Sequence, residues 1–238
     1  MNRENLDNIR EIFSLSANTI HKARNEIRII LFEDRELVVK SFKVPHFLNR
    51  IIYTFFRDSK AKRSYDYSIK LGSFAPNPMG YKIYKKFGLI EQSYFVSEKF
   101  EYDFTIKSPL FDSNFENREE ILIAFTKFTY QLHQSNILHL DYSPGNILIK
   151  KEKKEYSFKI VDINRMKFKK LSLNERLKNF SKLWAKDEDI CIIAEEYAKL
   201  IDRDKDICIK KALNYTQKDK DMKNLKNILK GRKIIKRS

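Results

Sequence analysis

The sequence predicts an α+β protein with two lobes, a small antiparallel-sheet lobe followed by a mostly helical lobe. Strand-like segments rich in Ile, Leu, Val and Phe occupy much of residues 19–100 and flank one long helical pattern. Residues 117–136 and about 172–230 instead repeat apolar side chains at helical spacing. The chain has 238 residues, of which 42% are hydrophobic, and this is enough for one compact domain or two small lobes.

The first lobe is expected to begin with a helix, because Leu6, Ile9 and Phe13 recur at helical spacing. A polar turn at Glu33-Asp34 separates the first strands, and Gly72 ends the long helix. The expected elements are a helix over 2–15, strands over 19–32 and 35–43, a helix over 57–71, and strands over 81–84 and 92–100.

The lobe boundary is expected near residues 100–103, which gives lobes of residues 1–101 and 102–238. Asn117 and Glu120 resemble a capping box at the start of a helix that ends near Asn136. A hairpin over 147–150 and 156–163 follows, and helical patterns continue over about 172–230.

Several features favour a soluble, cytosolic protein. The longest apolar run, residues 51–56, is far shorter than the roughly 20 residues of a membrane span. The polar N-terminus lacks the features of a secretory signal. Cys191 and Cys208 are too few for a disulfide framework, so both are expected to be free thiols.

The chain carries a formal net charge of +16, and much of it lies at the C-terminus. Residues 218–238 contain nine Lys or Arg and two Asp, and they form a basic amphipathic helical pattern interrupted near Gly231. Either this is a solvated helix docked by its apolar side, or it attracts an anionic membrane surface. No base-reading motif is present, and therefore nucleic acid is not an expected partner.

The most informative segment is His139-Leu-Asp141-Tyr-Ser-Pro-Gly-Asn146. An Asp and an Asn at this spacing recur in phosphoryl-transfer enzymes, where the Asp faces the acceptor hydroxyl and the Asn helps to hold Mg²⁺. Asp162, within an apolar strand, supplies a second oxygen ligand for the metal. His139 is expected to support the loop by hydrogen bonds to backbone rather than to transfer a proton.

Lys40 ends an apolar strand and is the expected partner of ATP phosphates. Such a lysine is fixed by a carboxylate on the following helix, for which Asp66 is the candidate and Asp58 the alternative. Taken singly, Lys40 could be a surface lysine and Asn146 could close a Pro-Gly turn. A turn alone does not explain Asp141.

These motifs resemble the lipopolysaccharide core kinases that act on Kdo or heptose, within the protein-kinase-like superfamily, and most closely the small Bacteroidetes-type members. The resemblance extends over nearly the whole chain and is most specific in residues 139–146 and 161–165. It implies a bilobal protein-kinase-like fold, with ATP and Mg²⁺ as cofactors. It also implies transfer of phosphate to an inner-core sugar hydroxyl, with Lys40, Asp141 and Asp162 among the acting residues.

The chain departs from related patterns in its nucleotide-binding segments. No G-x-G-x-x-G precedes Lys40, and the turn that is Lys-Gly-Arg-Asn-like in the family carries Ala23 here, followed by Arg24 and Asn25. The family resemblance adds Glu98 and Phe100 as nucleotide-binding candidates. The D-F-G and A-P-E elements are missing, so a small or lipid-linked acceptor is expected rather than a protein.

An inner-core and lipid A acceptor is anionic, so the basic surface would steer the protein to the cytosolic face of the inner membrane as a peripheral protein. The alternatives are a nucleotide-binding pseudokinase scaffold and a kinase of another small molecule, such as an aminoglycoside-type sugar. The residues that bind the phosphate donor do not separate these acceptors, and the sequence gives no oligomeric state.

Overall fold

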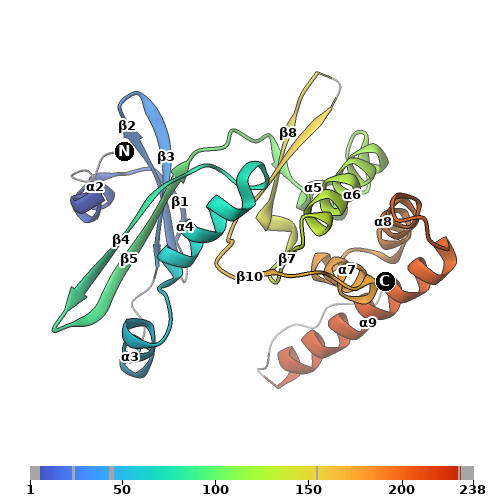
Figure 1. Cartoon of the computed structure of the whole chain (residues 1–238). Helices are drawn as coiled ribbons and strands as arrows, with labels where there is room; N and C mark the ends of the chain where they lie inside the picture. The colour runs from blue at the N-terminus through green and yellow to red at the C-terminus, as the bar shows by residue number, and fades with distance from the viewer. Residues whose placement is uncertain (1–5, 23–24, 43–45, 154, 230, 232–238) are drawn as a thin grey trace. The chain divides into compact units, whose positions relative to one another are not determined.

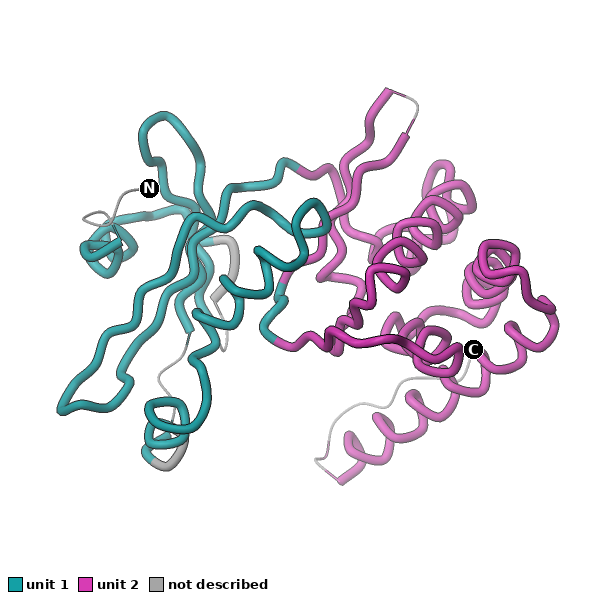
Figure 2. The backbone as a smooth tube through the Cα atoms, in the orientation of Figure 1, with its two compact units in different colours: residues 1–101, 162–164 teal, residues 102–161, 165–238 magenta. Residues whose placement is uncertain are grey.

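The computed structural model describes residues 6–22, 25–42, 46–153, 155–229 and 231. The chain divides into two compact units (Figure 2): unit 1 contains residues 1–101 and 162–164, and unit 2 contains residues 102–161 and 165–238. The predicted α+β class is confirmed, because an antiparallel sheet near the N-terminus is followed by a mainly helical part (Figure 1).

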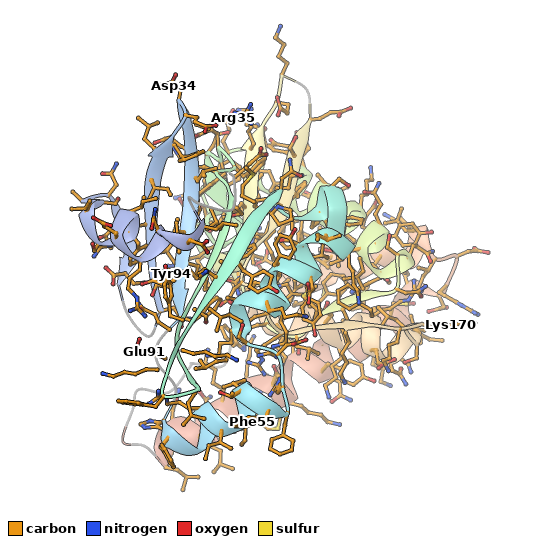
Figure 3. The ribbon with its side chains drawn as sticks, turned by 60° about the vertical axis from the view of Figure 1, so that its left-hand side comes forward. Asp34, Arg35, Phe55, Glu91, Tyr94 and Lys170 are labelled. Atoms are coloured by element: carbon orange, nitrogen blue, oxygen red, sulfur yellow. The ribbon has the colours of Figure 1, made fainter. Side chains whose placement is uncertain are left out.

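Unit 1 is built on an antiparallel sheet with the strand order β1-β2-β3-β5-β4. Its turn between β2 and β3 uses Glu33 and Asp34, both with positive φ, as expected of a polar hairpin turn (Asp34 is labelled at its tip in Figure 3). The strands are β1 (Thr19–Lys22), β2 (Asn25–Phe32), β3 (Arg35–Phe42), β4 (Pro78–Lys86) and β5 (Leu89–Glu98).

Strand β3 presents its alternate residues to two separate clusters of unit 1. Val39 packs in a cluster with Phe13 of α2 (Ile9–Leu15) and Tyr94, and the two rings lie 5.4 Å apart. Phe42 packs with Ala61 of α4 (Lys60–Leu71). Because side chains alternate along a strand, Lys40 shares the face of Phe42 and not that of Val39.

The helix expected over residues 57–71 is shorter in the structure, and a separate helix precedes it. That helix, α3, spans Phe47–Phe55, and sequence reasoning missed it. Ser59 rather than Asp58 caps α4, since the Ser59 hydroxyl accepts a hydrogen bond from the backbone N–H of Lys62 at 3.1 Å. The predicted end at Gly72 is confirmed, and a single helical turn, η1 (Gly72–Phe74), follows.

Unit 2 is mainly helical and packs around α6 (Arg118–Gln134). Phe125 of α6 is fully buried and has the rings of Tyr142, Phe158 and Phe180 around it. Two small antiparallel sheets, β10-β7 and β6-β8-β9, complete the unit. The other elements are β6 (Phe104–Thr105), α5 (Lys107–Phe111), β7 (Ile137–His139), η2 (Pro144–Asn146), β8 (Ile147–Lys151), β9 (Tyr156–Ile160), β10 (Met166–Phe168), α7 (Leu173–Asn179), η3 (Phe180–Leu183), α8 (Asp187–Leu200) and α9 (Lys205–Ile228).

The capping box expected at the start of α6 does not form. Asn117 precedes the helix with a φ of 54° and makes no capping hydrogen bond with its side chain. A capping box requires the first residue to be extended, and the left-handed backbone of Asn117 points its amide elsewhere.

The basic C-terminal pattern lies partly on α9, whose end at Ile228 leaves Lys230 and residues 232–238 outside the described part. Met222, Leu225 and Leu229 are each more than half exposed, so the described end of this segment is not docked by its apolar side. Cys191 and Cys208 are free thiols, as predicted. Within the described ranges, every helix is too short or too polar to traverse a bilayer.

Candidate active site

The predicted lysine and one predicted metal ligand meet in unit 1. Lys40 lies in β3, between Ile27 of β2 and Phe95 of β5 in the sheet register, and its side chain is only 12% exposed. Its Nζ lies 2.6 Å from Oδ1 of Asp162, a residue 122 positions later in the chain. A partly buried ammonium requires a compensating charge, and Asp162 supplies it.

Asp162 is held in an uncommon conformation by a residue that sequence reasoning missed. Its φ is 56°, in the left-handed region that Asp and Asn adopt more readily than other non-glycine residues. Asn164 donates from Nδ2 to Oδ1 of Asp162 at 2.5 Å, and Lys40 binds the same oxygen. Both bonds are made to Oδ1, and neither is made to Oδ2 of Asp162. The signal for Asn164 was its position two residues after Asp162, next to the apolar residues Val161 and Ile163.

Asp66, the residue expected to fix Lys40, is paired elsewhere. Its Oδ2 lies 2.8 Å from Nζ of Lys62, one helical turn earlier in α4, and Asp58 lies 3.2 Å from the same amine. Carboxylates and ammonium groups at this spacing are neighbours on a helix surface. The structure therefore does not bring Asp66 or Asp58 to Lys40, whose carboxylate partner is Asp162.

The loop after β7 in unit 2 holds Asp141 and Asn146 together. Asn146 donates from Nδ2 to the backbone oxygen of Asp141 at 2.9 Å, and the N–H of Ser143 donates to that oxygen at 2.8 Å. The amide nitrogen of Asn146 is thereby fixed toward the loop, and its Oδ1 can act only as an acceptor. The Asp141 carboxylate is partly exposed, with Nη1 of Arg165 3.6 Å from its Oδ2.

His139 makes hydrogen bonds to backbone groups of this loop, as the sequence predicted. Its Nδ1 accepts from the N–H of Asp141 at 3.0 Å, so the ring proton must lie on Nε2. Nε2 then donates to the backbone oxygen of Val161, also at 3.0 Å. A neutral ring satisfies both bonds, and it joins the segment before Asp141 to the residue before Asp162 within unit 2.

A buried polar chain supports the same loop from the helices of unit 2. Asn179, at the end of α7, donates from Nδ2 to the backbone oxygen of His139 at 3.0 Å. Its Oδ1 lies 3.1 Å from Nε2 of His133, and Nδ1 of His133 lies 2.9 Å from the Tyr197 hydroxyl. Because Asn179 Oδ1 can only accept, His133 donates to it and accepts from Tyr197. Burial lowers the pKa of His133 to about 4 and raises that of Tyr197 to about 12.

The buried hydrogen bonds of His133 predict that the stability of the protein falls as the pH is lowered. The unfolded chain binds a proton at His133 near pH 6.5, whereas the folded protein does so only near pH 4. The stabilisation from the neutral ring is therefore fully present above pH 6.5 and is lost as the pH falls to about 4, by on the order of 3 kcal/mol. We expect His133→Gln to be less stable than the parent protein at pH 7 but to lose less stability between pH 7 and pH 4.5 in urea unfolding.

The matched control for His133 is His46→Gln, because His46 is an exposed histidine. It should leave the slope of stability against pH unchanged. Parallel losses of unfolding free energy in the parent protein and the His133→Gln variant would contradict a buried neutral ring.

The candidate metal ligands are neutral or anionic oxygens, the type that Mg²⁺ prefers. The β8–β9 ladder of unit 2 ends with the N–H of Val161 donating to the backbone oxygen of Asn146 at 2.9 Å, and Asp162 is the next residue in the chain. No three His, Cys, Asp or Glu side chains gather into a metal cluster in the described part of the chain. The Asp162 carboxylate of unit 1 and the Asn146 amide oxygen of unit 2 are each donors of the kind that Mg²⁺ binds together with nucleotide phosphates.

The remaining nucleotide candidates are only partly described. Ala23 and Arg24 lie outside the described residues. Asn25 begins β2, and its Oδ1 is buried without a hydrogen-bond partner among the described residues. Glu98 ends β5 and accepts from Nδ2 of Asn77 at 2.8 Å, and Phe100 follows two residues later, half-buried.

Comparison with known proteins identifies the family. The model of the lipopolysaccharide kinase (Kdo/WaaP) family matches residues 69–203, more than half of the chain, a range that includes Asp141, Asn146 and Asp162 but not Lys40. A solved structure of WaaP in complex with acyl carrier protein has a similar fold, with a TM-score of 0.55 and 13% identity over 88% of this chain and 91% of that one. Curated proteins gave no significant sequence match. This chain belongs to the lipopolysaccharide kinase (Kdo/WaaP) family.

Proposed function

We propose that this protein is an ATP-dependent kinase that phosphorylates a sugar hydroxyl, on Kdo or heptose, in the inner core of lipopolysaccharide. Family membership supports a phosphotransferase of this kind. The observation that carries the proposal is the 2.6 Å contact between Lys40 Nζ and Asp162 Oδ1. It joins the expected phosphate-binding amine to the expected metal-binding carboxylate across 122 positions of sequence.

Each proposed role follows from the chemistry of its side chain. Lys40 neutralises phosphate charge, and Asn146 and Asp162 hold Mg²⁺ through oxygen atoms. Mg²⁺, when bound, neutralises the charge that develops on the transferred phosphate. Asp141 faces the acceptor hydroxyl and takes its proton late in the transfer, because the transition state is loose.

The proposal assigns nucleotide binding to residues 1–101 and the catalytic loop and metal ligands mainly to residues 102–238. Asp66 remains a proposed catalytic residue, and its pairing with Lys62 means that it would have to change partners to act on Lys40. The further proposed nucleotide-binding residues are Ala23, Arg24, Asn25, Glu98 and Phe100.

The charge of the chain supports an anionic acceptor. A net charge of +16 would draw the protein to lipid A phosphates and to an anionic membrane, and would raise the rate of encounter. The proposed location is the cytosolic face of the inner membrane, with the protein bound peripherally. Acyl carrier protein, bound to WaaP in the similar structure, is a further partner to test.

The decisive experiment is mass spectrometry of lipid A–core from cells with and without this protein. We expect the core from cells that lack the gene to lack one phosphate. The parent gene should restore this phosphate, and the gene for the Asp141→Asn variant should not. Fragmentation of the core then names Kdo or heptose as the acceptor. The control is equal amounts of both proteins in the complemented cells.

If the lipid A–core carried the same phosphates with and without the protein, an inner-core sugar would not be the acceptor. If purified protein still turned over ATP with another sugar, such as an aminoglycoside, the enzyme class would stand and the substrate would change. If it turned over no ATP, a nucleotide-binding scaffold would replace the kinase.

A further inference from the structure

Helix α3 is attached to the sheet of unit 1 by polar groups. Arg50 donates from Nε to the backbone oxygen of Ile90 at 2.7 Å, and the N–H of Ile90 donates to Oγ1 of Thr54 at 3.0 Å. Thr54 also donates to the backbone oxygen of Arg50 at 2.6 Å. These bonds hold the side of the helix that carries Arg50 and Thr54 against β5.

The apolar side of α3 consequently faces solvent. Phe55 is 68% exposed and Phe56, directly after the helix, is 81% exposed. Phe47 and Ile52 are also exposed, and Figure 3 shows the Phe55 ring pointing away from the ribbon. A surface helix of a soluble domain ordinarily turns its apolar side to the core, whereas Phe47, Ile52 and Phe55 of α3 are all exposed. A cluster of large exposed apolar side chains indicates an interaction surface.

The turn between β4 and β5 adds an aromatic side chain to this end of unit 1. Phe87 is 93% exposed, and its φ is 52°. Lys85 and Lys86 precede it and are exposed, with Nζ of Lys86 5.7 Å from the Phe87 ring centre. Figures 1 and 3 both show this turn and α3 at the same end of the sheet.

A polar pocket connects the two elements. It has a volume of about 410 Å³ and is lined by residues from the end of α3, the start of α4 and the β4–β5 hairpin. Its cations are Arg57, Lys62 and Lys85, and its acid, Asp58, is paired with Lys62. The rim of the apolar side therefore carries an excess of positive charge suited to phosphate groups.

We propose that α3 and the β4–β5 turn form a docking surface for an anionic phospholipid bilayer. The aromatic side chains of Phe55, Phe56 and Phe87 enter the headgroup–acyl boundary, and Arg57, Lys85 and Lys86 contact lipid phosphates. This combination of exposed aromatic rings and flanking cations is how interfacial helices bind membranes. A protein partner is less well matched, since the pocket beside the helix is lined mainly by polar and charged groups and offers no apolar groove.

The surface contains none of the residues proposed for catalysis, so membrane binding and kinase activity can fail independently. It also shares no residue with the basic C-terminal segment. The test measures flotation of the full chain with vesicles, without nucleotide. One set of vesicles is anionic and contains phosphatidylethanolamine and phosphatidylglycerol. The other set is neutral and contains only phosphatidylcholine.

We expect binding only to the anionic vesicles. Phe55→Gln with Phe56→Gln should lower the partition coefficient at least about tenfold, because each phenylalanine contributes its transfer free energy. Lys85→Glu with Lys86→Glu should weaken binding most at low salt. In a third variant, Phe55→Trp, the added fluorescence should shift to the blue on binding and be quenched by brominated lipid.

The matched control is Leu31→Gln, which removes an exposed apolar side chain of the same unit from β2, outside the surface. It should bind vesicles like the parent protein, and all variants should share its thermal midpoint. The proposal is overturned if the double phenylalanine variant binds vesicles unchanged, or if neutral vesicles bind equally well. It is also overturned if that variant loses binding to acyl carrier protein and not to vesicles.

Discussion

Replacing Asp162 with Asn is expected to lower the turnover of the kinase at least about a thousandfold. The substitution keeps the shape of the side chain and suits the left-handed backbone, whose φ is 56°. It removes the negative charge that faces Lys40 Nζ at 2.6 Å and that would hold the metal. Losing one preorganised electrostatic contact in a transition state commonly costs a hundred- to thousandfold, and here the lost charge serves two positive groups.

The measurement is kcat for phosphate transfer from ATP to lipid A–core across a range of Mg²⁺ concentrations. Excess Mg²⁺ should not restore the parent rate, because Asn supplies no charge. The matched control is Asp202→Asn, an exposed Asp with a φ of 50°, which should retain full activity. Retention of more than a tenth of the parent rate by the Asp162→Asn variant would refute the proposed role of this carboxylate.

Replacing Arg118 with Ala is expected to cause the largest loss of stability. The Asp189 side chain is fully buried in unit 2 and forms an ion pair with Nη2 of Arg118, which also donates from Nε to the backbone oxygen of Pro109 at 2.7 Å. Removing one partner leaves a buried charge uncompensated, and this costs about 3–5 kcal/mol. For a protein of this size, the thermal midpoint should fall by about 6–20 °C.

The loss should depend on pH in a defined direction. Burial already raises the pKa of Asp189, with Arg118 opposing it, and removing Arg118 raises that pKa further. The folded variant then binds a proton more tightly than the unfolded chain does. Its stability is greatest below the ordinary carboxyl pKa and is lost as the pH rises through the raised one. The deficit relative to the parent should therefore be larger at pH 7 than at pH 5.

Urea unfolding of the Arg118→Ala variant at the two pH values measures this difference. The double variant Arg118→Met with Asp189→Leu is the control, since two apolar side chains leave no buried charge and should recover most of the lost stability. Equal deficits at both pH values, with no recovery in the double variant, would mean that Asp189 is not charged in the folded protein.

Sequence reasoning succeeded where local patterns decide the outcome. Segments rich in Ile, Leu, Val and Phe predicted the strands on either side of the turn at Glu33-Asp34, and Gly72 predicted the end of α4. The Asp141–Asn146 spacing predicted a loop that the structure closes with a hydrogen bond from the Asn146 amide. Each of these features depends on residues close together in the chain.

It fell short where side-chain contacts, rather than local patterns, decide the outcome. Helix α3 was missed although its apolar residues recur at helical spacing, and several of them, Phe55 among them, are exposed to solvent. Asp66 stays a proposed partner of Lys40, but in the structure its carboxylate pairs with Lys62, one turn away on the same helix. Asn179 has a functional neighbour only because tertiary packing brings it to the loop at His139, 40 positions earlier in the chain.

Unit 1 is discontinuous, because residues 162–164 belong with residues 1–101. During synthesis, the strand bearing Lys40 leaves the ribosome long before Asp162 is translated, so its amine must remain hydrated until then. A fragment that stops at residue 101 would contain every strand of this sheet but would lack the only carboxylate paired with Lys40 among the described residues. Attempts to express the two parts separately should therefore graft the Asp162–Asn164 tripeptide onto the first part, or supply it as a peptide.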